Sequence, residues 1–174
     1  MDVLLDMLEA NNAIMTGSLV REEPAPAVLA LTAGSPLSAN SFASFSRYST
    51  RVRRRYADLL LFLPAGAPML QTLQICYDEL QKKYDIAASL RITRALAMER
   101  LTVLDCDQSA PLSLVTACMT ELAEWSLDVA LRCCQAQLQA SHGQPQSSDR
   151  QRSNLWIVGM GKLGARELNV SSDI

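Results

Sequence analysis

The chain has 174 residues, of which 49% are hydrophobic and 20% are charged. This balance is typical of a soluble globular protein with a real core, and it excludes a disordered or fibrous chain. With a net charge of -2 and a pI of about 5.4, the chain has no overall basic field that would attract nucleic acid or an anionic membrane, so any phosphate binding has to be local.

Apolar residues recur at three- and four-residue steps through most of the first 140 positions, and this spacing predicts helices. Proline and glycine clusters separate several of them because they bias the backbone away from the helical region. In the last helix, a broad apolar stripe that includes Trp125 is more typical of a protein core than of a cofactor site. The predicted helices cover residues 1–10, 26–32, 41–63, 69–84, 86–104 and 111–140.

The helix predicted for residues 41–63 carries a basic run made of Arg51, Arg53, Arg54 and Arg55. One interpretation of such a run is a patch that binds phosphate or nucleic acid. The favoured interpretation is a solvated face whose long side-chain stems cover apolar surface.

Cysteine and histidine usage argues against a zinc site and indicates a reducing compartment. His142, the single histidine, lies in a polar segment away from the cysteines, which include no C-x-x-C pair. The acidic N-terminus lacks the basic region of a secretory signal, and no apolar run approaches the ~18 residues that span a bilayer. We therefore expect a cytoplasmic protein without membrane or nucleic-acid partners. Buried small hydrophobes are the expected role of the five cysteines, Cys76, Cys106, Cys118, Cys133 and Cys134.

Residues 141–153 are almost entirely polar and predict a linker or exposed loop, because they offer too little apolar surface to offset the entropy of ordering. Directly after them, Leu155 to Val158 has the first clear strand pattern, so helical periodicity ends here. We predict a helical region over residues 1–140, a linker over 141–153 and the start of a second domain over 154–174.

Three glycines follow the predicted strand with the spacing Gly159-x-Gly161-x-x-Gly164. The spacing matches the dinucleotide-binding fingerprint, but that fingerprint opens a long apolar helix, whereas residues 165–172 are polar and short. A Walker A loop is excluded because Leu163 stands where it needs Ser or Thr. A dinucleotide-binding fragment is therefore the less favoured interpretation.

The opening of a nucleotidyl-transfer site fits these residues better. The glycines let the backbone approach a phosphate, and Lys162 supplies positive charge. After a short helical segment, Ser171 and Ser172 lead into a second strand that contains Asp173. Two carboxylates one residue apart on a strand point to the same face and can hold Mg²⁺ against a triphosphate. Asp173 would be the first of such a pair, and the second would follow Ile174.

Residues 159–174, GMGKLGARELNVSSDI, closely resemble the signature of the bacterial bifunctional glutamine synthetase adenylyltransferase/adenylyl-removing enzymes, a family of the DNA polymerase β-like nucleotidyltransferase superfamily. The family usually has glycine where this chain has Ala165. Residues 90–105 and 115–123 are more weakly similar to the helical segment that precedes the family's first catalytic domain. The resemblance implies a mainly α fold, in which a helical region is followed by the truncated start of an α/β nucleotidyltransferase domain of the polymerase β-like type.

The resemblance also implies an activity. A first motif preceded by one helical region is similar to the N-terminal, adenylyl-removing half of the family, which releases AMP from a modified tyrosine of glutamine synthetase by phosphorolysis and yields ADP. The other half attaches AMP from ATP. By resemblance, the cofactor is Mg²⁺, the protein substrate is glutamine synthetase, and the regulators are the PII signal protein and glutamine.

Carried over to this sequence, the resemblance makes Asp173 the expected catalytic residue and Mg²⁺ ligand. Ser171 and Ser172 are expected to position the loop by hydrogen bonds or to contact phosphate oxygens. For the glycines alone the alternative is a tight turn without a ligand, and for Asp173 it is a solvated carboxylate at a strand end. The expected phosphate loop consists of Gly159, Gly161, Lys162 and Gly164.

One carboxylate does not fix two metal ions, so we expect the 174-residue polypeptide to be an N-terminal fragment without catalytic activity of its own. We also expect residues 154–174 to be poorly ordered in solution, since a strand without its sheet leaves backbone groups unpaired. The competing interpretation is a helical interaction module, in which the region up to residue 140 docks a protein partner and the terminal motif is incidental.

Overall fold

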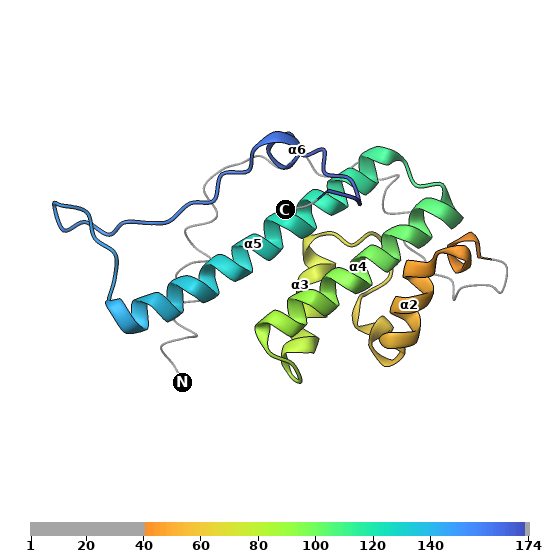
Figure 1. The fold of residues 1–174 in the computed structure, drawn as a ribbon, viewed down its shortest axis with the longest axis horizontal. Coiled ribbons are helices and arrows are strands. Elements are labelled where there is room, and N and C mark those ends of the chain that lie inside the picture. Colours follow the sequence, from red (N-terminus) through yellow and green to blue (C-terminus); the bar gives the residue numbers. More distant parts are fainter. Residues whose placement is uncertain (1–40, 173–174) are drawn as a thin grey trace. The chain divides into compact units, whose positions relative to one another are not determined.

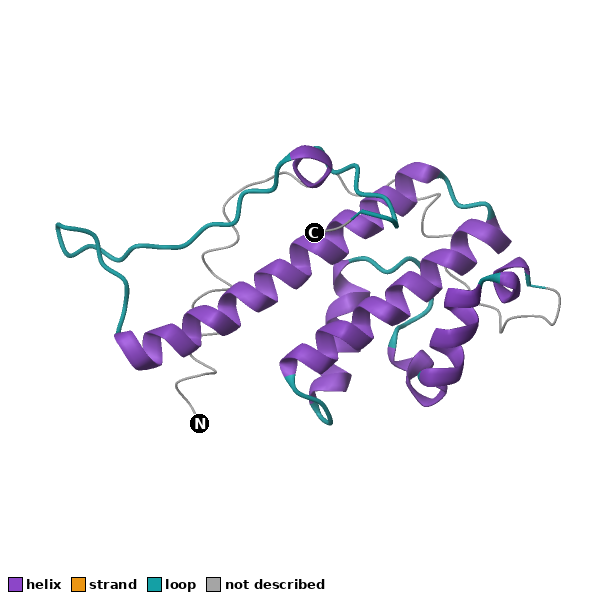
Figure 2. Cartoon of the chain, in the orientation of Figure 1, coloured by secondary structure: helices purple, strands orange, loops and turns teal. Residues whose placement is uncertain are grey.

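The structure is a computed structural model that describes residues 41–172. The chain divides into two units, Met1–Ala30 and Leu31–Ile174, and every described residue belongs to the second. The helices predicted for residues 1–10 and 26–32 lie outside the described residues, as does Asp173. The described residues are mainly helical and contain no β-strand (Figure 2), which confirms the mainly α prediction.

Three helices follow their predicted ranges closely: α3 spans Leu70–Gln81, α4 spans Ile86–Gln108 and α5 spans Leu112–His142. α4 begins where predicted because a carboxylate oxygen of Asp85 accepts a hydrogen bond from the Ala88 backbone N–H at 2.6 Å. It continues past the predicted end at residue 104 and ends at Ser109, whose φ of 51° is left-handed.

The single helix predicted for residues 41–63 is wrong, because the structure has three short elements there. They are η2 (Phe42–Phe45), α2 (Arg47–Arg55) and η3 (Ala57–Phe62), and η2 and η3 are 3₁₀-helices. The first break falls at Ser46, which has an extended backbone and whose hydroxyl accepts a hydrogen bond from the Ser49 N–H at 3.2 Å. A serine in this role starts a helix rather than continuing one.

The break changes which aromatic side chains reach the core. Phe42 and Phe45 belong to the apolar spacing from which the helix over residues 41–63 is predicted, yet they are 70% and 83% exposed. The second break falls at Tyr56, where φ is -122°. Val52 and Leu59, on either side of this break, are both buried as predicted.

The buried residues of α2, α3, α4 and α5 form two apolar clusters, and both clusters include residues of α3 and α4. Figure 1 shows α4 running between α3 and α2. One cluster, which includes Leu80 and Leu96, joins α2 and η3 to α3 and α4. The other joins α3 and α4 to α5. In it, the rings of Tyr77 and Trp125 meet edge to face at 5.4 Å, and the Trp125 indole N–H donates to Gln74 at 3.0 Å.

The apolar stripe of α5 lies in the core only in the first part of the helix. Its residues are buried as far as Val129, whereas Leu131 is half-buried and Leu138 is 57% exposed. α5 has 31 residues, but α3 and α4 have only 12 and 23. The end of α5 therefore extends beyond the described helices that it packs against. None of the described helices is long and apolar enough to cross a membrane.

The cysteines were all predicted to be buried, and this is wrong for three of them. Cys76 and Cys118 are fully buried, but Cys106 and Cys134 are exposed and Cys133 is half-buried. Helical periodicity explains the difference, since adjacent residues such as Cys133 and Cys134 cannot share one face of a helix. Burial raises the pKa of the Cys76 thiol to about 11 and that of Cys118 to about 12.

After α5 the chain is largely irregular as far as α6, a short helix that spans Gly161–Gly164. A single antiparallel bridge joins Gln146 to Arg152. The strand predicted for residues 155–158 is wrong for the described chain, where these residues pair with no other strand. A strand needs a hydrogen-bonded neighbour, and the described residues offer none to this segment. The domain boundary within residues 141–153 stays a prediction.

Candidate functional site

The glycine segment, residues 159–172, contains every predicted site residue except Asp173. Its first part is a tight turn that two glycines make possible. Gly161 has a left-handed φ of 57°. A Cβ atom on Gly164 would lie only 2.5 Å from the carbonyl oxygen of Gly159, which is closer than real Cβ contacts. The turn therefore requires glycine at 161 for conformation and at 164 for space.

The turn closes with a capping motif that the sequence did not reveal. Arg166 adopts a left-handed φ of 59°. Its N–H donates to the Leu163 carbonyl at 3.1 Å, and the next N–H, that of Glu167, donates to the Lys162 carbonyl at 2.8 Å. This pair of bonds is a Schellman motif, which glycine usually occupies at the left-handed position. Because arginine stands there, no glycine signal was available to predict it.

An ion pair attaches the glycine segment to α5, and one apolar side chain of the segment is buried. The Arg166 guanidinium donates to both carboxylate oxygens of Glu124 on α5, at 3.0 and 2.9 Å. Leu168 is buried, with 3% of its surface exposed. The two charged side chains are 54% and 43% exposed, so their ion pair contributes little stability. Nothing in the sequence indicates a role for the buried Leu168.

Ser171 and Ser172 are both organised by Asn169. Its side-chain oxygen accepts hydrogen bonds from the Ser171 hydroxyl at 3.0 Å, the Ser172 hydroxyl at 2.8 Å and the Ser171 N–H at 3.2 Å. An asparagine that bonds to the backbone two residues on is a common turn former, and this was the signal that could have identified Asn169. The hydroxyls therefore hold the end of the segment in shape, while their predicted contact with phosphate stays a prediction.

The described part of the segment does not fit a metal ion. Nowhere in residues 41–172 do three His, Cys, Asp or Glu side chains gather as a metal site would require. The predicted ligand Asp173 lies outside these residues. Lys162 is exposed, and no acidic group pairs with it within the described range. The length of α6, four residues, also does not fit the long helix that follows a dinucleotide-binding loop.

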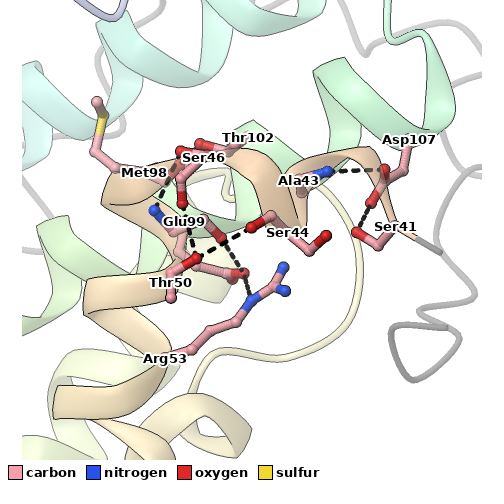
Figure 3. A network of polar contacts seen from close by, with 11 residues as sticks. Ser41, Ala43, Ser44, Ser46, Thr50, Arg53, Met98, Glu99, Thr102 and Asp107 are labelled. Atoms are coloured by element: carbon pink, nitrogen blue, oxygen red, sulfur yellow. Dashed lines mark hydrogen bonds and ion pairs between the residues drawn. The ribbon is translucent and has the colours of Figure 1, made fainter. Parts of the chain in front are cut away.

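Arg53 differs from the other arginines of the predicted basic run in α2, and Figure 3 shows its contact with Glu99. Arg51, Arg54 and Arg55 are exposed, as the solvated-face interpretation predicted. Arg53 instead turns toward α4, where its Nε donates to the buried Glu99 carboxylate at 2.5 Å. The Ser49 hydroxyl donates to the same oxygen at 3.2 Å. One terminal nitrogen of Arg53 is buried without a described partner.

A second polar contact ties η2 to the end of α4. The Asp107 carboxylate accepts hydrogen bonds from the Ser41 hydroxyl at 2.5 Å and from the Ala43 N–H at 3.1 Å (Figure 3). Desolvation raises the pKa of this carboxyl, but these hydrogen bonds and one from the Phe42 backbone outweigh it, so the pKa lies below its usual value. Glu99 and Asp107 therefore position η2 and α2 against α4 through polar groups.

The chain is thus a mainly helical protein in which a glycine-rich turn follows the longest described helix and is joined to it by an ion pair. A family model described as glutamate-ammonia ligase adenylyltransferase matches residues 33–174. The chain belongs to this family. No solved structure matches it.

Three relatives that share the name bifunctional glutamine synthetase adenylyltransferase/adenylyl-removing enzyme are similar to different shares of the chain. The relative from Burkholderia mallei is 44% identical over 86 residues, which are 49% of this chain and 9% of the relative. That from Ralstonia nicotianae is 35% identical over 141 residues, 75% of this chain and 15% of the relative. That from Bordetella pertussis is 36% identical over 152 residues, 79% of this chain and 16% of the relative. The chain thus spans less than a fifth of their length.

Proposed function

We propose that this chain is part of an enzyme that regulates glutamine synthetase by adenylylation and deadenylylation of a tyrosine, and that it belongs to the adenylyl-removing half. The observation that carries the proposal is the family match over residues 33–174, which includes the whole glycine segment. The left-handed Gly161 and the close approach at Gly164 support it, because they leave the turn free of side chains where a phosphate could approach the backbone.

In this proposal each part of the glycine segment has a role. Gly159, Gly161 and Gly164 shape the loop, and the exposed Lys162 supplies positive charge to phosphate oxygens. Ser171 and Ser172 keep the loop's end in place through Asn169. ATP, ADP and phosphate are the proposed substrates or products, and the PII signal protein is a proposed regulator. The proposed location is the cytoplasm.

Asp173 is the proposed catalytic residue and Mg²⁺ ligand. When bound, the ion would stabilise the charge of the phosphoryl groups. One carboxylate is too few to hold such an ion for catalysis. We therefore propose that the 174-residue polypeptide by itself does not release AMP.

The test places this chain's residues in a complete relative. Residues 33–174 replace the aligned segment of the Bordetella pertussis protein, and phosphate-dependent release of AMP from adenylylated glutamine synthetase is measured. We expect the chimera to release AMP and the isolated polypeptide to release none. Asp173→Asn in the chimera is expected to lower AMP release by at least about 100-fold, or about 2.7 kcal/mol of transition-state stabilisation.

The matched control is Asp149→Asn, which removes one carboxylate from the exposed segment before the glycine turn. It is expected to leave AMP release unchanged. A folded chimera that binds glutamine synthetase but whose AMP release is insensitive to Asp173→Asn would contradict the assignment. The helical interaction module would be favoured instead if residues 1–153 alone bind glutamine synthetase and the chimera releases no AMP.

A further inference from the structure

A hollow of about 370 Å³ lies where α2 and η3 meet the beginning of α4. Its floor is apolar, and Leu59 and Ile92 in it are buried members of the cluster that joins α2 to α3 and α4. A floor that belongs to a packed core is fixed in place. The volume lies within the range of about 300–1,000 Å³ that is common for small-molecule sites.

Three cations from separate parts of the fold line this hollow. Arg55 ends α2, Lys83 lies in the turn between α3 and α4, and Arg91 lies in α4. Within residues 41–172 none of them forms an ion pair. Among the described residues that line the hollow, Asp58 alone is acidic. The hollow therefore carries a surplus of positive charge that an anion would neutralise.

The charge is a regional feature of the chain. Ten Arg and Lys residues but only five Asp and Glu residues lie between positions 47 and 100. All other positions together have six Arg and Lys residues and thirteen Asp and Glu residues. The acidic pI of the whole chain hides this local surplus.

Two tyrosines stand beside the cations. The Arg55 guanidinium carbon lies 5.4 Å from the centre of the Tyr56 ring, and the Lys83 ammonium lies 5.6 Å from that of Tyr84. Both tyrosines are half-buried and line the hollow. These cation–π contacts hold the positive groups at the rim. The tyrosines and the apolar floor together offer a surface on which a planar ring can lie.

We propose that this hollow is a nucleotide-binding site, in which Arg55, Lys83 and Arg91 hold the phosphate, and the tyrosines together with the apolar floor receive the base. Bound phosphate takes charge-assisted hydrogen bonds from arginine and lysine. The proposal goes beyond the function proposed above, in which the nucleotide binds at the glycine segment. The two sites share no residue, so each can be tested without the other.

The test is isothermal titration calorimetry of the 174-residue chain with AMP, ADP, adenosine and inorganic phosphate. We expect AMP and ADP to bind. Adenosine and inorganic phosphate should each bind at least about tenfold more weakly, because adenosine lacks the phosphate and inorganic phosphate lacks the base. The double variant Arg55→Gln/Arg91→Gln is expected to weaken AMP binding by about tenfold or more. Both side chains are exposed, so thermal unfolding followed by circular dichroism should show an intact fold.

Arg54→Gln is the matched control, because Arg54 is an exposed neighbour on α2 that lines a different hollow. AMP affinity should be unchanged in it, whereas Lys162→Gln alters the glycine segment and reports whether AMP binds there instead. Affinity that is lost in Lys162→Gln and kept in the double variant would overturn the proposal. So would equal affinity for AMP and inorganic phosphate, which would show nonspecific anion binding.

Discussion

The helical body, residues 42–142, and the glycine segment, residues 159–172, keep their conformations by different means. The helical body relies on contacts between residues far apart in the sequence, such as those of Glu99 with Ser49 and Arg53. Most hydrogen bonds of the glycine segment join residues within five positions of each other. Among the described residues, its distant contact is the ion pair of Arg166 with Glu124.

The most recognisable part of the sequence is therefore not the most strongly packed. A local hydrogen-bonded turn needs particular residues at particular positions, which makes its sequence distinctive. A helical core needs apolar residues of suitable volume at a given spacing, and many sequences satisfy that requirement. Substitutions should therefore have large effects on the stability of the helical body and small ones in the glycine segment.

The largest effect is expected from Leu80→Ala in the helical body. Leu80 is fully buried in the cluster between α3 and α4, so its truncation should lower the free energy of unfolding by about 2–5 kcal/mol. Urea denaturation followed by circular dichroism measures this change. The matched control is Leu61→Ala, which removes the same atoms from a side chain that is 91% exposed, and a change within about 0.5 kcal/mol is expected. Similar losses in both variants would show that the described core is wrong.

Next in size is the loss of the carboxylate that anchors α2 to α4. Glu99→Ala leaves the Arg53 guanidinium without its partner, and the side chains are only 8% and 20% exposed. Allowing for the partial exposure of Arg53, we expect a loss of about 2–3 kcal/mol in the free energy of unfolding. In the control Glu79→Ala, which breaks an exposed pair with Lys82, the expected loss is below about 0.5 kcal/mol. A loss no greater than the control's would contradict the anchoring role.

The buried cysteines predict how stability depends on pH. Burial raises the pKa of the thiols of Cys76 and Cys118 from 9.0 to about 11 and about 12. The folded protein therefore retains protons that the unfolded chain has lost above about pH 9. Its stability should fall as pH rises from there, by up to about 1.4 kcal/mol per pH unit for each thiol. This contribution is fully present below about pH 9.

The pH slope can be checked by urea denaturation between about pH 8 and pH 10. Cys118→Ala should make the fall in stability shallower, because one raised thiol is gone. Cys134→Ala, which removes an exposed thiol of α5, should leave the slope unchanged. Equal slopes in the two variants would mean that burial of Cys118 does not raise its pKa.

The smallest change in overall stability is expected where the glycine segment meets α5. Glu124→Gln weakens an exposed ion pair, so it should cost less than about 1 kcal/mol. Its local effect should be larger, with faster hydrogen exchange at the backbone amides of Arg166 and Glu167. The control Asp128→Asn breaks another exposed pair of the same helix, with Arg132, and should leave those amides unaffected. Unchanged exchange in Glu124→Gln would show that the ion pair does not hold the segment.

The sequence predicted the three long helices because their apolar spacing and end signals agree. The prediction of one helix over residues 41–63 failed because the apolar spacing continues through Ser46, where side-chain capping starts a new helix. The strand over residues 155–158 failed for another reason, since strand formation depends on a neighbour elsewhere in space. In the glycine segment, the tight turn followed from the glycines, but Arg166 and Asn169 were missed because their roles appear only in hydrogen bonds.

The helical character of the described chain, the glycine-dependent turn and the resemblance to the family can all be read from the sequence. Each depends on residue type and short spacing, which act through local backbone preference and steric fit. The inward turn of Arg53 and the exposure of Arg55 emerge from the packed helices. So does the meeting of Leu59, Lys83 and Arg91 at one hollow. Such groupings depend on how helices pack, and packing brings together residues whose separation in the sequence carries no signal of their proximity.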